Sequence, residues 1–133
     1  MFFYINIQNS LNYKKKNVFF IKKIIIMGFV YLLGDAGKEN MYKIGVTRGK
    51  IEKRIKQLQT GNSNEIYLVN FFETKYPFYM ERILHSKFHI KQTKNEWFNL
   101  TNEDVDDFIN SCNLIEENTK VLENNPFAIK ELK

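Results

Sequence analysis

The sequence has a single cysteine, Cys112, among its 133 residues. One cysteine excludes a disulfide framework and a zinc site built on cysteine ligands. Long hydrophobic runs are also missing, since the longest, residues 24–33, is about half of the roughly 20 residues that a membrane-spanning helix needs. The N-terminus lacks the charged segment and the cleavage site of a secretory signal. We therefore expect an intracellular protein without a membrane partner, in the cytoplasm, the nucleus or a viral factory.

Acidic residues are absent from the beginning of the chain, and the charge is uneven along its length. Residues 1–26 carry five lysines and no acid, residues 27–100 carry twelve basic and seven acidic residues, and residues 101–133 carry three basic and eight acidic residues. The net charge of +5 favours a polyanionic partner that meets the first hundred residues. Hydrophobic residues make up 44%, which is enough for one domain with a core.

These shifts in composition divide the chain into three parts. Residues 1–26 show no periodic pattern, and we interpret them as an extension that is disordered or outside the core. A basic arm that adds phosphate contacts is the alternative. Residues 27–100 form the predicted domain, and residues 101–133 are predicted to be an acidic C-terminal helix and a tail.

The hydrophobic patterns indicate an α+β fold, with a small three-stranded antiparallel sheet flanked by helices. The short polar loop between the first two strands predicts an antiparallel hairpin. If this hairpin is symmetrical about Gly37, Tyr31 lies opposite Lys43 on one face of the sheet. The predicted strands are residues 29–33, 42–46 and 66–72, the predicted helices are residues 51–59, 77–90 and 101–117, and residues 97–98 belong to the core on a short strand or loop.

Two predicted helices carry charged side chains at the border of their apolar stripes. Glu81 borders the stripe of the second helix, and a boundary pair with His85 one turn later is the plain structural interpretation. A zinc stripe of Glu81, His85 and His89 is disfavoured, because the three side chains fan out around the helix. Arg54 borders the stripe of the first helix, where a guanidinium could hold a phosphate through two hydrogen bonds. That helix is strongly basic, which fits either a solvated surface or a phosphate-binding face; its lysines are Lys50, Lys53 and Lys56.

Tyr31 and Lys43 are a third candidate feature. An ammonium group close to a phenol lowers the pKa of the phenol, because it favours the phenolate. A tyrosine tuned in this way could accept a proton from water near neutral pH. An ordinary aromatic residue and an ordinary lysine on a half-exposed strand are the alternative.

The order of these features resembles the GIY-YIG nuclease superfamily, in particular a branch found in phages, large DNA viruses and some cells and often labelled a DNA-binding domain. The resemblance covers about residues 28–100. Phe29 stands where the first signature has glycine, and Lys43 stands where many members have tyrosine. The matching segments are residues 29–31 (FVY), residues 43–45 (KIG), Arg54 with Leu58 and residues 60–62 (TGN), Glu81 with residues 84–85 (LH) and Phe88, and residues 96–98 (EWF).

The resemblance implies hydrolysis of DNA phosphodiester bonds with Mg²⁺ or Mn²⁺ as the cofactor. Tyr31 would be the general base on the attacking water, and Lys43 would hold the pKa of its phenol down. Glu81 would hold the metal ion, Arg54 would neutralise charge on the phosphate, and His85 would assist the leaving group or orient Glu81. The residues predicted to contact nucleic acid are Lys50, Lys53, Arg54 and Lys56.

Two other functions stay open at this point. One is a non-catalytic nucleic-acid-binding module on the same scaffold, and the other is an interaction domain that binds no nucleic acid. The predicted partner is DNA, with RNA as the alternative, and no small-molecule cofactor is expected.

Overall fold

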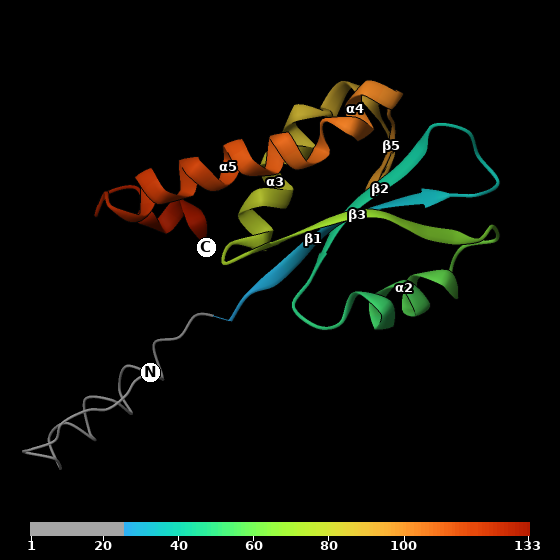
Figure 1. Ribbon diagram of the computed structural model, residues 1–133, viewed down its shortest axis with the longest axis horizontal. Helices are drawn as coiled ribbons and strands as arrows, with labels where there is room; N and C mark the ends of the chain where they lie inside the picture. Colours follow the sequence, from blue (N-terminus) through green and yellow to red (C-terminus); the bar gives the residue numbers. More distant parts are fainter. Residues whose placement is uncertain (1–25) are drawn as a thin grey trace, which may run out of the picture.

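An antiparallel sheet of five strands lies at the centre of the structure, a computed structural model that describes residues 26–133 (Figure 1). The strand order is β3-β1-β2-β5-β4, and each neighbouring pair is antiparallel. The predicted α+β class is confirmed, whereas the predicted number of three strands is wrong. The strands are β1 (Gly28–Asp35), β2 (Met41–Thr47), β3 (Ile66–Thr74), β4 (Gln92–Lys94) and β5 (Trp97–Asn99).

The two additional strands form a small hairpin at one side of the sheet. β4 and β5 have three residues each, which is too short to show the alternation by which a strand is recognised in a sequence. Their turn contains Asn95 with φ of 55°, a left-handed conformation that asparagine tolerates better than most residues. β5 joins this hairpin to the sheet by pairing Trp97 with Lys43 of β2.

Helices cover both faces of the sheet (Figure 1). One face presents Tyr31, Leu33 and Ile66, and α2 packs on it through Ile55 and Leu58. α3 and α5 pack on the opposite face, which holds the larger part of the core. The helices are α2 (Ile51–Gln59), α3 (Pro77–Lys87), α4 (Asn102–Asp106) and α5 (Phe108–Glu123), with 3₁₀ turns η1 (His89–Lys91) and η2 (Ile129–Leu132).

The C-terminal part differs from the single helix predicted for residues 101–117. Thr101 and Asp104 form a capping box, but the helix that they open ends at Asp106, and the separate helix α5 runs from Phe108 to Glu123. Phe108 and Cys112 of α5 are buried in the core against the sheet.

The predicted extension of residues 1–26 lies outside the described part of the chain, apart from Ile26. Within residues 26–133, no helix is both long and apolar enough to cross a membrane.

The hairpin of β1 and β2 has a different register from the predicted one. Tyr31 pairs with Gly45, and Lys43 pairs with Leu33, so the predicted pairing of Tyr31 with Lys43 is wrong. The turn is held by Asp35, whose Oδ1 accepts a hydrogen bond from the backbone N–H of Gly37 at 2.8 Å. The shift is two residues along one strand, and because side chains alternate with a period of two, Tyr31 and Lys43 still share a face.

Gly45 makes room for the ring of Tyr31. A Cβ atom at this position would lie 2.5 Å from Tyr31 Oη and 2.7 Å from its Cζ. Tyr31 is fully buried, so its ring has no space to move away. The glycine of the KIG segment is therefore a steric requirement of the buried tyrosine.

We expect Gly45→Ala to lower the free energy of unfolding by about 1–3 kcal/mol, the usual cost of overpacking a filled core. Gly49→Ala is the matched control, because its new methyl group would have its nearest neighbour at 3.8 Å. Urea denaturation followed by circular dichroism measures both variants. Equal free energies of unfolding for Gly45→Ala and Gly49→Ala would contradict the tight contact between position 45 and the ring of Tyr31.

Candidate functional site

The hydroxyl of Tyr31 is held by a guanidinium under α2. Tyr31 has no solvent-exposed surface, and its Oη accepts a hydrogen bond from Arg54 Nε at 3.4 Å. Arg54 is partly exposed, and its Nη1 donates to Gln57 Oε1 at 3.4 Å. The guanidinium therefore connects a buried phenol with the surface, where an anion could reach its other side.

Burial raises the pKa of Tyr31, which is the opposite of the predicted direction. Arg54 lowers this pKa through its hydrogen bond and its charge, while the negative charges of Glu96 and Glu81 raise it, and the loss of solvation is the largest of these effects. The expectation that Lys43 depresses the pKa of the phenol is wrong. The cation that favours the phenolate is Arg54.

Lys43 is committed to a different partner. Its Nζ lies 3.0 Å from Glu96 Oε1 and 5.6 Å from the centre of the Trp97 ring. Lys43 is nearly buried, with 9% of its surface exposed, so a nearby carboxylate is needed to offset the loss of solvation. This partner comes from the β4–β5 hairpin, which the sequence did not reveal as a pair of strands.

Glu81 and His85 reach the same region from the other face of the sheet. The backbone pairing of β2 with the β4–β5 hairpin ends at Ile44, whose N–H donates to the carbonyl oxygen of Glu96 at 3.2 Å. The carbonyl oxygen of Ile44 is 2.9 Å from His85 Nε2, which donates to it. Glu81 Oε2 is 3.9 Å from the same nitrogen. His85 is thereby fixed by the backbone of β2 and borders the carboxylate of Glu81.

Burial also raises the pKa of Glu81. The negative charge of Glu96 raises it further, and the positive charges of His85, Lys43 and Arg54 lower it. Glu81 is thus a partly buried carboxylate whose ionised form is short of positive charge. We use the name polar cluster for the side chains whose charges meet here: Tyr31, Lys43, Arg54, Glu81, His85 and Glu96.

The structure therefore brings together all five side chains predicted to do chemistry, from two strands and two helices. Glu96 was missed as a site residue, although it belongs to the EWF segment and directly precedes the strand that pairs with Lys43. Of the predicted nucleic-acid contacts, Arg54 belongs to the cluster, whereas the three lysines are exposed on and before α2: Lys50, Lys53 and Lys56.

The polar cluster offers few protein ligands for a metal ion. Within the described residues, no group of three or more His, Cys, Asp or Glu side chains is placed to hold a metal ion. Magnesium keeps most of its waters and needs only one or two carboxylates. The carboxylate of Glu81 fits such an ion, because the cations around it do not fully compensate its negative charge. His85 Nε2 is engaged with Ile44, so Glu81 would be the protein ligand of such an ion.

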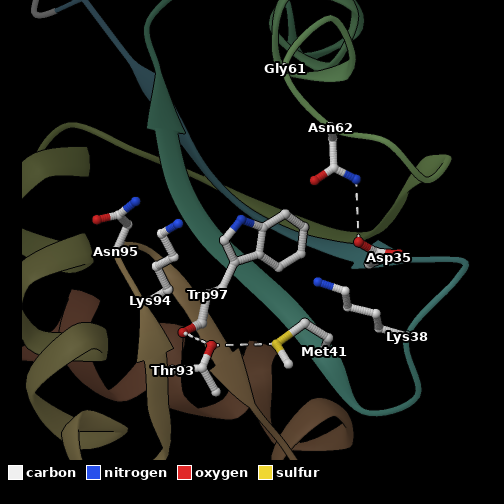
Figure 2. A pocket seen from close by; sticks show the side chains of 9 residues that line it. All are labelled: Asp35, Lys38, Met41, Gly61, Asn62, Thr93, Lys94, Asn95 and Trp97. Atoms are coloured by element: carbon white, nitrogen blue, oxygen red, sulfur yellow. Dashed lines mark hydrogen bonds between the residues drawn. The ribbon is translucent and has the colours of Figure 1, made fainter.

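A hollow of about 460 Å³ lies beside the polar cluster, and we call it the Trp97 hollow (Figure 2). A second hollow of about 250 Å³, lined by Lys43 and the C-terminal end of α2, adjoins it. The two share Gly61, Asn62 and Trp97. The two hollows therefore lie next to each other at Trp97, and Lys43 lines the second one.

Comparison with known families assigns the chain. The family model of the T5orf172 domain matches residues 28–113, from the start of β1 into α5. The chain belongs to the T5orf172 domain family. The assignment to the GIY-YIG superfamily is therefore wrong, because the model that matches is that of a different family. No curated protein and no solved structure matches the chain.

The T5orf172 domain indicates a nucleic-acid-binding or endonuclease-like function. This agrees with the excess of basic over acidic residues between positions 27 and 100 and with the exposed lysines of α2. The partner class is thus nucleic acid.

We expect Glu81→Gln to raise the melting temperature at pH 7 by a few degrees. Because burial raises the pKa of Glu81, the folded state holds its proton more tightly than the unfolded chain does. The stability that this group contributes is therefore present at low pH and is lost as the pH rises through the raised pKa.

Differential scanning fluorimetry at pH 7 and pH 4 measures the effect, and the gain should shrink at pH 4, where the wild-type carboxyl is already protonated. The control is Glu73→Gln, since Glu73 is an exposed carboxylate on β3. A melting temperature that falls at pH 7 would show that the carboxylate is a structural partner of its cationic neighbours.

Proposed function

We propose that this protein is a divalent-metal-dependent endonuclease that hydrolyses phosphodiester bonds of DNA. The observation that supports it most is the contact of Arg54 Nε with Tyr31 Oη at 3.4 Å beside the partly buried carboxylate of Glu81. A base, a cation for the phosphate and a carboxylate for a metal are the three groups that this hydrolysis needs.

In this proposal the guanidinium of Arg54 holds the phosphate oxygens and stabilises the charge that builds up on them. The phenolate oxygen of Tyr31 takes a proton from the attacking water, and the water oxygen forms a bond to phosphorus. The bond from phosphorus to the leaving oxygen then breaks, and the leaving oxygen takes up a proton from solvent water. Arg54 also favours the phenolate of Tyr31, because its charge lowers the pKa of the phenol.

Glu81 would hold Mg²⁺ or Mn²⁺, an ion that supplies positive charge at the leaving oxygen. His85 is placed to position Glu81, since its Nε2 is tied to the carbonyl of Ile44. Lys43 keeps Glu96 paired, so that Glu96 adds less negative charge to the surroundings of Glu81.

The phosphate backbone on either side of the reacting bond would lie along α2. Lys50, Lys53 and Lys56 are exposed there, and each ammonium that contacts a phosphate releases a counterion. Binding through these lysines is independent of sequence.

A second candidate, a nucleic-acid-binding module without catalysis, is favoured by one observation. Tyr31 is fully buried, and the same burial raises its pKa, so little phenolate exists near neutral pH. In such a module Arg54 and the lysines of α2 would bind phosphate, and Tyr31 would only support the guanidinium.

A plasmid-nicking assay separates the two candidates. We expect wild-type protein to nick supercoiled DNA with Mg²⁺ or Mn²⁺ and to stop when the metal is chelated. Tyr31→Phe should reduce the rate by about 10²–10⁴-fold, the usual contribution of a general base, and Glu81→Ala and Arg54→Ala should abolish nicking.

The matched controls are Tyr67→Phe and Glu73→Gln, both at exposed positions of β3, and they should nick like wild type. If the wild-type protein binds DNA and never nicks it with either metal, the binding module is the correct function.

The pH dependence of nicking tests the role of Tyr31. Because burial raises the pKa of its phenol, the phenolate fraction is small at pH 7 and grows about tenfold for each pH unit. The initial nicking rate should therefore rise with a slope near one in log units between about pH 7 and pH 9. A flat profile for wild type would remove Tyr31 from the role of general base.

A further inference from the structure

The Trp97 hollow has the size of a ligand pocket and lies next to the polar cluster. Its volume of about 460 Å³ falls in the range of about 300–1,000 Å³ that small-molecule pockets occupy. It adjoins the hollow that Lys43 lines. A group bound in the Trp97 hollow would therefore be a close neighbour of a phosphate at Arg54.

The indole of Trp97 is a rigid wall of this hollow (Figure 2). The backbone of Trp97 is held by its pairing with Lys43, and its carbonyl oxygen accepts a hydrogen bond from Thr93 Oγ1 at 3.2 Å. The side chain is only partly buried, so part of the ring is free for contact. An aromatic ring held in this way is a platform for stacking.

The rim of the hollow is polar and carries positive charge. Lys38 and Lys94 stand on either side of the indole (Figure 2). The one carboxylate of the lining, Asp35, is occupied, since it accepts hydrogen bonds from the N–H of Gly37 at 2.8 Å and from Asn62 Nδ2 at 3.2 Å. The lining therefore carries two lysines against one carboxylate, a net positive charge that suits a ligand with phosphates.

We propose that the Trp97 hollow binds an unpaired nucleobase, stacked on the indole of Trp97, from the strand whose phosphate lies at the polar cluster. This inference rests on the proposed nucleic-acid function. Lys38 and Lys94 contact the phosphates that flank the stacked nucleotide.

An unpaired base is required by the geometry of stacking. In a duplex both faces of a base are covered by its neighbours, so a base that stacks on a protein ring has left the stack. Single-stranded nucleic acid offers such bases without the cost of unpairing. The protein therefore prefers single strands, or junctions with unpaired nucleotides, over a continuous duplex.

The tryptophan fluorescence of the protein comes from the wall of this hollow, because Trp97 is the only tryptophan of the chain. The full-length protein is titrated, with the divalent metal chelated, with a DNA single strand of about ten nucleotides, a length within the usual site sizes. We expect strong quenching by the single strand. A blunt duplex of equal length and a single strand of equal length with abasic sites should quench little at saturation.

Variants test the energetic role of the ring. Trp97→Ala should weaken binding of the single strand by about 5–150-fold, the range reported for loss of one stacked base, and leave duplex binding within about twofold of wild type. Trp97→Phe keeps a stacking ring and should retain most of the affinity. Phe127→Ala removes an aromatic side chain that is 88% exposed in the C-terminal segment and should change nothing.

Two results overturn the inference: quenching by the abasic strand equal to that by the normal strand, or unchanged single-strand affinity in Trp97→Ala. If Trp97→Ala loses cooperative unfolding, the comparison of wild type with Trp97→Phe and the abasic strand decides. Quenching without nicking in either metal keeps the base site and ends the endonuclease proposal. Nicking without quenching keeps the endonuclease proposal and ends the base site. Absence of all DNA binding ends both the base site and the endonuclease proposal.

Discussion

The close approach of the Tyr31 ring to the backbone of β2 at Gly45 is the contact on which the site depends. It lets a bulky aromatic side chain lie flat on the sheet under α2, and it aims the hydroxyl at Arg54. With a larger residue at position 45 the ring would be lifted, and the guanidinium would lose the buried partner that fixes its orientation. One missing side chain on β2 thus determines where a charged group of α2 stands.

The second constraint is the point at which the pairing of β2 with the β4–β5 hairpin ends. Because the last backbone hydrogen bond runs from the N–H of Ile44 to Glu96, the carbonyl of Ile44 is left for His85, and α3 can bring Glu81 around the edge of the sheet. Side chains from both faces meet at this point, which explains how residues on opposite layers come to share one electrostatic environment. The effects of Arg54 and Glu96 on the pKa of both Tyr31 and Glu81 follow from this meeting.

The sequence was sufficient for the long elements and insufficient for the short ones. Runs of β-forming residues predicted the strands around Tyr31 and Ile44, and periodic apolar residues predicted the helices that carry Arg54 and Glu81, because local patterns determine elements of that length. The three-residue strands are fixed by pairing with β2, a tertiary contact that leaves no local pattern.

The same limit explains the errors at the site. The convergence of the polar cluster was expected only from the resemblance to a nuclease family. The pairing of Lys43 with Glu96 and the direction of the pKa of Tyr31 depend on burial and on neighbours distant in the chain. The family assignment went wrong because short motifs do not separate one family from another as a match along 86 positions, residues 28–113, does.

The β4–β5 hairpin has a consequence for how this surface responds to its ligand. Glu96 and Trp97 are neighbours in the chain, at the end of the turn and the start of β5. Glu96 faces the ammonium of Lys43, and Trp97 lines the Trp97 hollow. A displacement of the hairpin by whatever occupies the hollow would move Glu96 by a similar distance. Binding of a ligand in the Trp97 hollow would thereby change the negative charge near Glu81, because Trp97 and Glu96 are linked by a single peptide bond.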